Sequence, residues 1–564
     1  MIPQLVPIWA KTIDSFTQCS WDARRHTVLP VALICLCALL FFYRLAARDL
    51  WGSHEARAAQ NAQRMLDDHA WLVPRLFDDH FDLQKPPMYY WLVAGLTRLG
   101  GGRVNAWTER LPAAIAATLC VFAVFYFLHR RGRPLAAFLG AVVLATAQHF
   151  TWLARTGRID MPLTLALTVA VLTIGMSQRW QFIRFVAIAM AILLKGPVAL
   201  ALFLVILSAN GMLEWRVTGS VTAALARNRW RLGIGLSVIV TLASLWFIAA
   251  NSRTNGEFFR VFFWHHNVDR ALGTSGELAS HPWWYYGPRL LVDTAPWSVL
   301  ILPATVWFCW RRRSLDDREA RFGLTWLVST VAVLSCARFK RADYLLPAYP
   351  GLALLVGCTL ERWWGEAPAW IRRPATIGFA GVVAAVIALW GCVLHIELPA
   401  REAEREQKSF ASAIRGVAPA PQVILFFRTE CHALVFHLGR PVNTFLEWEN
   451  LDVWAGREGP HYIVMSPECA DEWPLHVTSG KLERVLSNTE LAGGRHEKPL
   501  VLMRTRPNAE SCNAASRQQT GDCRCAAERG DSDLQSGRKI VREHFGMDGG
   551  SGKVGSLLRN PTCR

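Results

Sequence analysis

Charge is scarce in this sequence, and acidic charge is scarcer than basic charge. Only 19% of the 564 residues are charged, with 44 Asp and Glu against 61 Lys and Arg, while 52% are hydrophobic and 25 are tryptophan. The mean hydropathy is +0.20. A chain so poor in charge is unlike a soluble enzyme and is typical of a protein that crosses a membrane many times.

Several other features are absent. The net charge of +17 forms no single basic tract of the kind that binds nucleic acid, because short arginine clusters recur between apolar runs instead. The 14 cysteines show neither zinc-site spacing nor a disulfide framework. No internal or inverted repeat is visible, and no small-residue cleavage site follows the first apolar run, which we expect to be an uncleaved span.

Apolar segments of spanning length, or close to it, predict about eleven transmembrane helices. Their approximate limits are 29 to 47, 111 to 128, 135 to 154, 161 to 177, 182 to 194, 197 to 213, 232 to 250, 290 to 310, 322 to 337, 344 to 360 and 376 to 395. We therefore expect a polytopic α-helical bundle over residues 29–396, after a cytoplasmic segment at 1–28.

Basic residues predict the orientation of this bundle. With the N-terminus in the cytoplasm, the clusters at 129–133, 227–231, 311–313 and 372–373 all fall on the cytoplasmic side. The extracytoplasmic side then receives the loops 48–110 and 251–289 and the turns 155–160, 195–197 and 338–343. These loops and turns hold nearly all the mixed charge, and charge at membrane depth marks a cavity or an ion pair. We expect a multi-pass protein of a bacterial inner membrane.

The loop that begins at Trp51 is long and polar. Ser53 is expected to cap a helix whose first turn carries His54, Glu55 and Arg57. The N-terminus of a helix favours anions such as phosphate, although a solvated connecting helix is the alternative. Further along, Lys85 precedes two prolines that hold the chain extended, so that a cation is presented just before the next helix.

Three turns on the same side contribute further charged residues. Asp160 opens a predicted span, either as its N-terminal cap or as a catalytic acid. Lys195 stands at a Gly-Pro break between two apolar segments, where it can snorkel to the interface. The last turn carries three cations and a tyrosine, namely Arg338, Lys340, Arg341 and Tyr344. Cations so dense suit a phosphate group, with a juxtamembrane anchor as the alternative.

The apolar spans stop after residue 396. Residues 401–416 are predicted to be helical, and 422–427, 461–465 and 499–504 to be buried strands. Residues 401–506 are therefore expected to form a small extracytoplasmic α/β domain. Residues 507–564 are rich in Gly, Ser, Asn and charge, and we expect them to be disordered.

Five motifs lie in one order and on one predicted side, and together they resemble the GT-C glycosyltransferases that use polyprenyl-phosphate sugars. The similarity is to the protein mannosyltransferase and lipid A aminoarabinose transferase group, over residues 48 to about 360. The motifs are Glu55-Ala56-Arg57, the run that begins Lys85-Pro86-Pro87, Arg158-Ile159-Asp160, Lys195-Gly196-Pro197 and the run from 338 to 344. The group typically reads Asp-Glu-x-Arg and Glu-Lys-Pro-Pro, and this chain has His54 and Gln84 at the two outer acids.

The resemblance implies a GT-C bundle with a small C-terminal α/β domain and the activity of a membrane glycosyltransferase. Such an enzyme moves a sugar from a polyprenyl-phosphate donor to an acceptor hydroxyl of a lipid, protein or glycan on the extracytoplasmic face. A carboxylate must take the acceptor proton, and the candidates are Glu55 and Asp160, with His54 third. Cations must hold the leaving phosphate, and the candidates are Arg57, Lys85, Arg338, Lys340 and Arg341, with Tyr344 as a hydrogen-bond donor. A single displacement would invert the anomeric centre, and retention stays open.

No metal is expected, since Gln84 is a poor ligand. His265 and His266 are the candidates for a divalent cation, because the similar aminoarabinose transferases have a histidine in this aromatic loop that acts with the glutamate before Lys-Pro-Pro. The expected partners are the lipid-linked donor, its acceptor and membrane lipids, with no nucleic acid. Two alternatives remain: a transporter or flippase built around the broken hairpin, and a homologue that binds sugar-lipids without catalysis.

Overall fold

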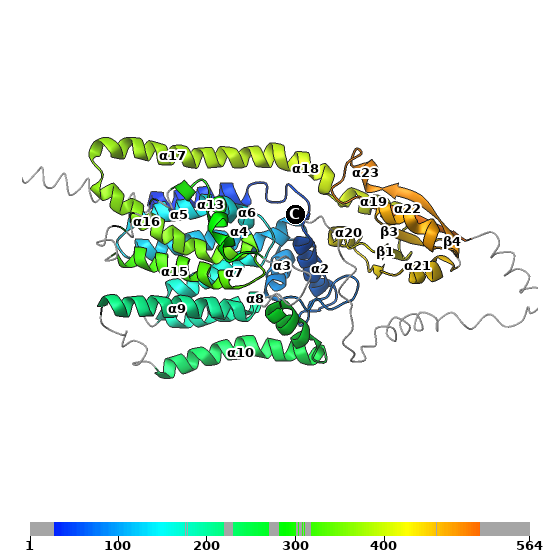
Figure 1. Ribbon diagram of the computed structural model, residues 1–564, viewed down its shortest axis with the longest axis horizontal. Coiled ribbons are helices and arrows are strands. Elements are labelled where there is room, and N and C mark those ends of the chain that lie inside the picture. Colours follow the sequence, from blue (N-terminus) through cyan, green and yellow to red (C-terminus); the bar gives the residue numbers. More distant parts are fainter. Residues whose placement is uncertain are drawn as a thin grey trace, which may run out of the picture.

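The computed structural model describes residues 27–507 except 175, 177–178, 219–228, 270–280, 300–302, 304–306, 308–309, 311–316 and 458. A helical bundle and an α/β domain make up this part of the chain (Figure 1). The predicted cytoplasmic segment 1–28, the tail 507–564 and the arginine clusters at 227–231 and 311–313 lie wholly or partly outside the described residues.

The helices of the bundle follow the predicted apolar segments. In chain order they are η1 (Ala38–Phe42), α2 (Ser53–Asp67), α3 (Met88–Leu99), α4 (Ala106–His129), α5 (Pro134–Thr146), α6 (Gln148–Ala154), α7 (Asp160–Leu172), α8 (Arg179–Lys195), α9 (Pro197–Thr218), α10 (Arg229–Arg253), α11 (Glu257–Phe259), η3 (Arg260–Asp269), η4 (Trp283–Tyr285), α13 (Tyr286–Asp293), α15 (Arg318–Cys336), η6 (Ala342–Ala348), α16 (Tyr349–Glu366), α17 (Ala369–Cys392) and η7 (Val393–Glu397). Apart from 290–310, which is only partly described, every predicted apolar segment overlaps a helix.

The number of full spans is smaller than predicted within the described residues. By length and composition four helices can cross a membrane, and the pair α5 and α6, bent by 69°, makes up to a fifth. Three more apolar helices, Thr27–Phe42, Asp160–Leu172 and Ser237–Arg253, are shorter than a span. Apolar length in the sequence overestimates helix length here, because α5 bends at Ala147 and α7 ends at Leu172.

Glycine contacts bring α5, α15 and α16 close together. A Cβ at Gly357 of α16 would lie 2.5 Å from the carbonyl oxygen of Ala136, and one at Gly323 of α15 would lie 2.6 Å from that of Gly351. Residues without side chains allow helix backbones to approach in this way. The packing fixes α16 and the preceding η6, whose residues contact α7.

The C-terminal domain contains a five-stranded sheet with the order β2-β1-β3-β5-β4. Its elements are α18 (Leu398–Arg405), α19 (Lys408–Val417), β1 (Ile424–Phe427), α20 (His432–Leu438), β2 (Asn443–Phe445), α21 (Trp448–Ala455), β3 (Tyr462–Met465), α22 (Pro467–His476), β4 (Gly480–Ser487), α23 (Asn488–Leu491) and β5 (Val501–Pro507). Strand β1 is parallel to β2 and β3, and β5 is antiparallel to β3 and β4. Alternate residues of β1 enter separate apolar clusters on the two faces of the sheet.

The α/β domain contacts the first long loop of the bundle. Helix α20 lies against α2, where the Gln60 side chain donates a hydrogen bond of 2.9 Å to the carbonyl of His432. The Phe436 ring stacks on Phe77 with centroids 6.4 Å apart. His437 Nε2 lies 2.8 Å from Asp49 Oδ2. These contacts hold the loop that begins α2 in a defined position.

Candidate active site

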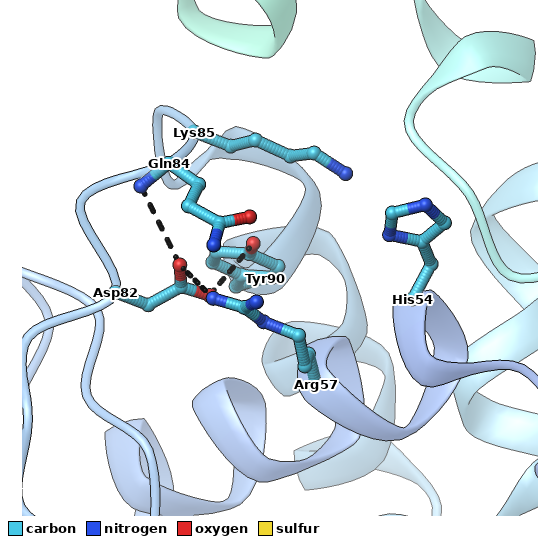
Figure 2. A pocket seen from close by; sticks show the side chains of 6 residues that line it. All are labelled: His54, Arg57, Asp82, Gln84, Lys85 and Tyr90. Atoms are coloured by element: carbon cyan, nitrogen blue, oxygen red, sulfur yellow. Dashed lines mark hydrogen bonds and ion pairs between the residues drawn. The ribbon is translucent and has the colours of Figure 1, made fainter. Parts of the chain in front are cut away.

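A pocket opens where the start of α2 meets the loop before α3. Figure 2 shows the six side chains that line it, those of His54, Arg57, Asp82, Gln84, Lys85 and Tyr90. The N-cap of α2 is Gly52 and no side chain caps the helix, so the predicted Ser53 cap is wrong by one residue. Ala56, Ala59 and Ala62 are fully buried on one face of α2, and His54 and Arg57 line the pocket.

Arg57 is neutralised within the protein. Its Nη2 lies 2.7 Å from Asp82 Oδ1, and Asp82 also accepts hydrogen bonds from Asn61 at 2.8 Å and from the Tyr90 hydroxyl at 3.4 Å. The Asp82 carboxylate is 2% exposed. Arg57 therefore lines the pocket with a charge that is already compensated.

Lys85 is a cation of a different kind. Within the described residues, no side chain or carbonyl makes a hydrogen bond or ion pair with its ammonium, and the side chain extends across the pocket toward His54 (Figure 2). Burial lowers the pKa of Lys85 from 10.5 to about 8 and the positive charges of Arg158 and Lys195 act in the same direction, against the opposing charges of Asp160 and Asp82. A partly buried ammonium with no directly bonded partner gains from an anion placed beside it.

His54 lies between two of the pocket cations. Its Nε2 is 3.3 Å from Arg341 Nη1. The charge of Lys85, then burial, then the charges of Arg158 and Arg341 lower the pKa of His54 from 6.5 to about 2, against the opposing charge of Asp160. The ring is therefore neutral over the physiological pH range.

Asp160 lies in a second group of charges next to the pocket. Its Oδ1 is 2.6 Å from Lys195 Nζ and its Oδ2 is 3.4 Å from Arg158 Nε. Arg158 Nη1 is in turn 2.5 Å from Asp343 Oδ2.

The N-cap of α7 is Ile159, with no side-chain cap, so the capping role considered for Asp160 is wrong. Lys195 is ion-paired with Asp160, and its ammonium also lies 4.0 Å from the centre of the Tyr344 ring.

Positive charge exceeds negative charge in this region. The four cations Lys85, Arg158, Lys195 and Arg341 surround two carboxylates, those of Asp160 and Asp343, in the described part of the chain. The remaining pair, Arg57 with Asp82, is neutral overall. The region thus carries a formal surplus of two positive charges, which an anionic group can compensate.

The run from 338 to 344 divides between two places. Arg341 and Tyr344 join the charged region through His54 and Lys195. Arg338 is exposed, and its carbonyl accepts a hydrogen bond of 3.1 Å from the amide of His281. The buried Lys340 ammonium donates to the carbonyls of His281, at 3.1 Å, and Ala337. Lys340 therefore joins two loops and does not line the pocket.

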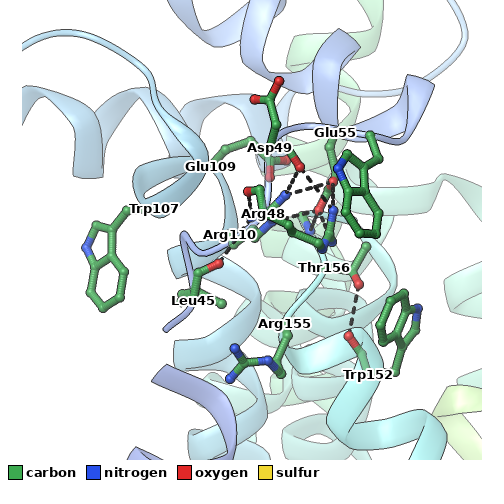
Figure 3. A network of polar contacts seen from close by, with 12 residues as sticks. Leu45, Arg48, Asp49, Glu55, Trp107, Glu109, Arg110, Trp152, Arg155 and Thr156 are labelled. Atoms are coloured by element: carbon green, nitrogen blue, oxygen red, sulfur yellow. Dashed lines mark hydrogen bonds and ion pairs between the residues drawn. The ribbon is translucent and has the colours of Figure 1, made fainter. Parts of the chain in front are cut away.

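Glu55 lies outside the pocket, in a buried network (Figure 3). Its two oxygens accept hydrogen bonds from Arg48 at 2.7 and 2.8 Å, from Arg110 at 2.9 and 3.1 Å, and from the amide of Gly157 at 3.0 Å. Burial opposes ionisation, but the charges of Arg110 and Arg48 outweigh it and lower the pKa of Glu55. A carboxylate engaged in this way is poorly placed to accept a proton from a substrate.

His149 is a residue that the sequence did not single out. Its Nε2 is 3.3 Å from Asp343 Oδ1, and its Nδ1 is 3.1 Å from the Tyr349 hydroxyl and 3.4 Å from Asp293 Oδ2. The side chain connects the charged region to α13 and α16. Its only sequence signal was a polar pair, Gln148 and His149, inside a predicted apolar span.

The histidines considered for a metal lie in η3. His265 Nδ1 is 3.7 Å from Asp269 Oδ2, and both side chains are largely exposed. The described residues contain no group of three or more His, Cys, Asp or Glu side chains that could hold a metal ion.

Comparison with known proteins finds relatives and solved structures to which this chain is similar. A model of the dolichyl-phosphate-mannose-protein mannosyltransferases matches residues 84–246. The undecaprenyl phosphate-alpha-4-amino-4-deoxy-L-arabinose arabinosyl transferase 1 of Pseudomonas fluorescens is 29% identical over 350 residues, 60% of each chain. The arabinosyl transferase of Pectobacterium atrosepticum is 28% identical over 382 residues, 64% of each chain. The chain thus matches about three fifths of the length of these relatives.

Solved structures extend the comparison to most of the chain. ArnT from Cupriavidus metallidurans, in its structure bound to undecaprenyl phosphate, has a TM-score of 0.68 at 18% identity, covering 85% of this chain and 98% of ArnT. The chain has the GT-C fold. The archaeal oligosaccharyltransferase AglB from Archaeoglobus fulgidus is more distant, with a TM-score of 0.51 at 11% identity over 79% of this chain and 70% of AglB. The GT-C resemblance predicted from the loop motifs is therefore confirmed.

The two departures from the GT-C motifs both fall on the pocket. His54 and Gln84 line it together with Lys85. Three of the other motif residues, Asp160, Lys195 and Arg341, lie together in the group of charges beside the pocket. The chain thus differs from the pattern of the similar transferases at two residues that line this pocket.

Proposed function

We propose that this protein is a membrane glycosyltransferase that moves a sugar from a polyprenyl-phosphate donor to an acceptor hydroxyl. The observation that carries the proposal is the Lys85 ammonium, which has no hydrogen bond or ion pair among the described residues and lies in a pocket whose surroundings hold a surplus of positive charge. A phosphate group is the anion that such a site suits. The relatives named above are transferases of a sugar from undecaprenyl phosphate, which supports a lipid phosphate as that anion.

In this proposal Lys85 and Arg341 hold the donor phosphate, with Arg158 and Lys195 on the side of Asp160. When the bond between the anomeric carbon and the phosphate oxygen breaks, the phosphate gains negative charge. Cations that are already in place stabilise this charge without reorganisation, and for this reason they lower the barrier. Tyr344 lies under Lys195 and orients its ammonium.

Asp160 is the proposed general base. The acceptor oxygen bonds to the anomeric carbon, its proton passes to the Asp160 carboxylate, and the lipid phosphate leaves, so the displacement inverts the anomeric centre. The Asp160 carboxylate is held by Lys195 at 2.6 Å and Arg158 at 3.4 Å. A phosphate that shares these two cations would weaken their hold and free the carboxylate for the acceptor.

The other candidates receive supporting roles in the proposal. Glu55 holds the start of α2 through Arg48 and Arg110, and Lys340 joins its loop to residue 281. Arg57 shapes the pocket as a neutral pair with Asp82, and Arg338 takes no part. We place the pocket and the α/β domain on the extracytoplasmic face of an inner membrane, with a lipid, protein or glycan as the acceptor.

The test is transfer by the purified protein in lipid nanodiscs, given polyprenyl-phosphate aminoarabinose, mannose and glucose in turn, with free lipid phosphate as the readout. Asp160→Asn should lower kcat by about 10²-fold or more, because a general base contributes at least that much. Lys85→Ala should raise KM and lower kcat. The matched controls are Asp471→Asn and Lys408→Ala, exposed residues of the α/β domain, which should leave turnover unchanged.

Two outcomes would contradict the proposal. A protein that binds a donor in a Lys85-dependent way but releases no lipid phosphate would be a sugar-lipid-binding homologue. A protein that moves the intact donor across a vesicle membrane, without cleavage, would be a flippase.

A further inference from the structure

We infer that His54 binds the donor phosphate as a neutral hydrogen-bond donor, through Nδ1, and takes no proton from the acceptor. The inference rests on the proposed function, because it assigns a role within the same pocket. It concerns a position where the similar transferases typically carry an aspartate, so it describes how this chain departs from them.

The first step is the tautomer of the ring. A guanidinium has only donors, and Arg341 Nη1 lies 3.3 Å from His54 Nε2, so this nitrogen must accept. A neutral imidazole carries one hydrogen, which is then on Nδ1. The nitrogen that would have to take a proton from a substrate is therefore already engaged by a cation.

The second step is the direction of the free nitrogen. Figure 2 shows the His54 ring edge turned toward Lys85 across the pocket. His54 is also in the first turn of α2, a helix of 15 residues whose N-cap makes no side-chain hydrogen bond. The unpaired amides of that turn add positive potential. An anion beside Lys85 would thus find a second donor in Nδ1.

The third step is the charge state. Three cations act on the ring, those of Lys85, Arg158 and Arg341, and one carboxylate, that of Asp160, opposes them. This surplus of positive charge keeps the imidazole neutral, consistent with its lowered pKa of about 2. A carboxylate in the same place would cancel one of the positive charges and repel a phosphate. Histidine keeps the surplus and adds a donor.

The test uses four variants at this position with two readouts, binding of decaprenyl phosphate to the protein in nanodiscs and steady-state transfer. His54→Asn places an amide nitrogen near Nδ1, and it should keep the Kd within about threefold of wild type. His54→Gln extends its amide toward the Nε2 position, and with His54→Ala it should weaken binding about tenfold or more, the usual effect of losing a hydrogen bond to a charged group. His54→Asp should bind the lipid phosphate most weakly. The kcat values should change much less than the Kd values.

A general base would give the opposite result. His54→Asn would then lower kcat by about 10²-fold or more with an unchanged Kd, and His54→Asp would retain turnover. That outcome overturns the inference. Lys85→Ala separates this failure from a failure of the proposed function: if it abolishes binding while His54→Ala does not, only the role of His54 is wrong. If wild type binds no lipid phosphate, the proposed function itself fails.

Discussion

Glu55 is a buried charge that is held by opposite charges. Arg48 and Arg110 contribute four hydrogen bonds to its oxygens, and its side chain is 2% exposed. Glu55→Gln should remove the carboxylate that both buried guanidinium groups contact directly, and the loss of one partner of a buried ion pair typically costs about 3–5 kcal/mol. We expect a clearly lower midpoint of thermal unfolding in detergent.

The control for this variant is Glu449→Gln, at an exposed position of α21, which should leave the midpoint unchanged. An unchanged midpoint in Glu55→Gln, together with lost turnover, would instead support the role of proton acceptor for which the sequence made Glu55 a candidate.

Lys85 should make lipid-phosphate binding sensitive to alkaline pH. Its pKa of about 8 means that the ammonium loses its proton as the pH rises above 8, whereas a phosphate monoester is already a dianion there. Binding of decaprenyl phosphate should therefore weaken steadily from pH 8 to 10. Lys85→Arg should remove this dependence, because a guanidinium stays charged.

The lowered pKa of Lys85 has the opposite effect on folding stability, which it increases as the pH rises. Between pH 8 and 10.5 the unfolded lysine binds more protons than the folded one, so this group adds stability as the pH rises. If the Kd of the wild-type protein for decaprenyl phosphate does not change up to pH 10, the pKa of Lys85 is not lowered.

At the scale of elements, the turn before α7 has no space for a side chain. A Cβ at Gly157 would overlap the fully buried carboxylate of Glu109, while the Gly157 amide donates to Glu55. Gly157→Ala should displace the turn, and with it Arg158 and Asp160. Overpacking of this kind costs about 1–3 kcal/mol, and turnover should fall further than stability because the charged region loses its geometry.

A helix glycine with open space around it serves as the control. Gly378 of α17 has no atom within 4 Å of a built Cβ, so Gly378→Ala should leave turnover unchanged and raise the unfolding midpoint slightly. If Gly157→Ala retains full turnover, the turn is more adaptable than its contacts indicate.

The sequence predicted the helices and strands better than it predicted which side chains contact one another. Apolar length and period predicted the helices, and continuous apolar runs predicted β1, β3 and β5, but β2 and β4 were missed because β2 has three residues and β4 alternates. Of the residues that the loop motifs singled out, Lys85 lines the pocket and Asp160 is ion-paired beside it, while their roles remain predictions. The role of Glu55 was not visible, because the guanidinium of Arg110 lies 55 positions away in the chain, and only the fold brings the two together.

At the scale of the whole molecule, the α/β domain supports the pocket from outside the bundle. Phe436 of α20 stacks on Phe77 of the long loop, and Gln60 of α2 reaches the same helix. Phe436→Asp should place a carboxylate against an aromatic ring and separate the two parts. We expect faster tryptic cleavage between α18 and α19, at Arg405 or Lys408, and reduced transfer.

The matched control is Leu446→Asp, at an exposed position of the same domain. It should change neither the cleavage rate nor transfer. Unchanged protection in Phe436→Asp would show that the domain is held by its polar contacts alone.

The surplus of positive charge around the pocket also has a consequence for product release. A polyprenyl-phosphate sugar is a phosphodiester with one negative charge, and the lipid phosphate left after transfer is a monoester that carries about −1.5 to −2 at neutral pH. A region with a formal surplus of two positive charges will therefore retain the spent carrier more tightly than the fresh donor. Product inhibition should then limit turnover in a closed vesicle, and sustained activity in a cell would depend on how quickly the spent carrier is removed from the membrane.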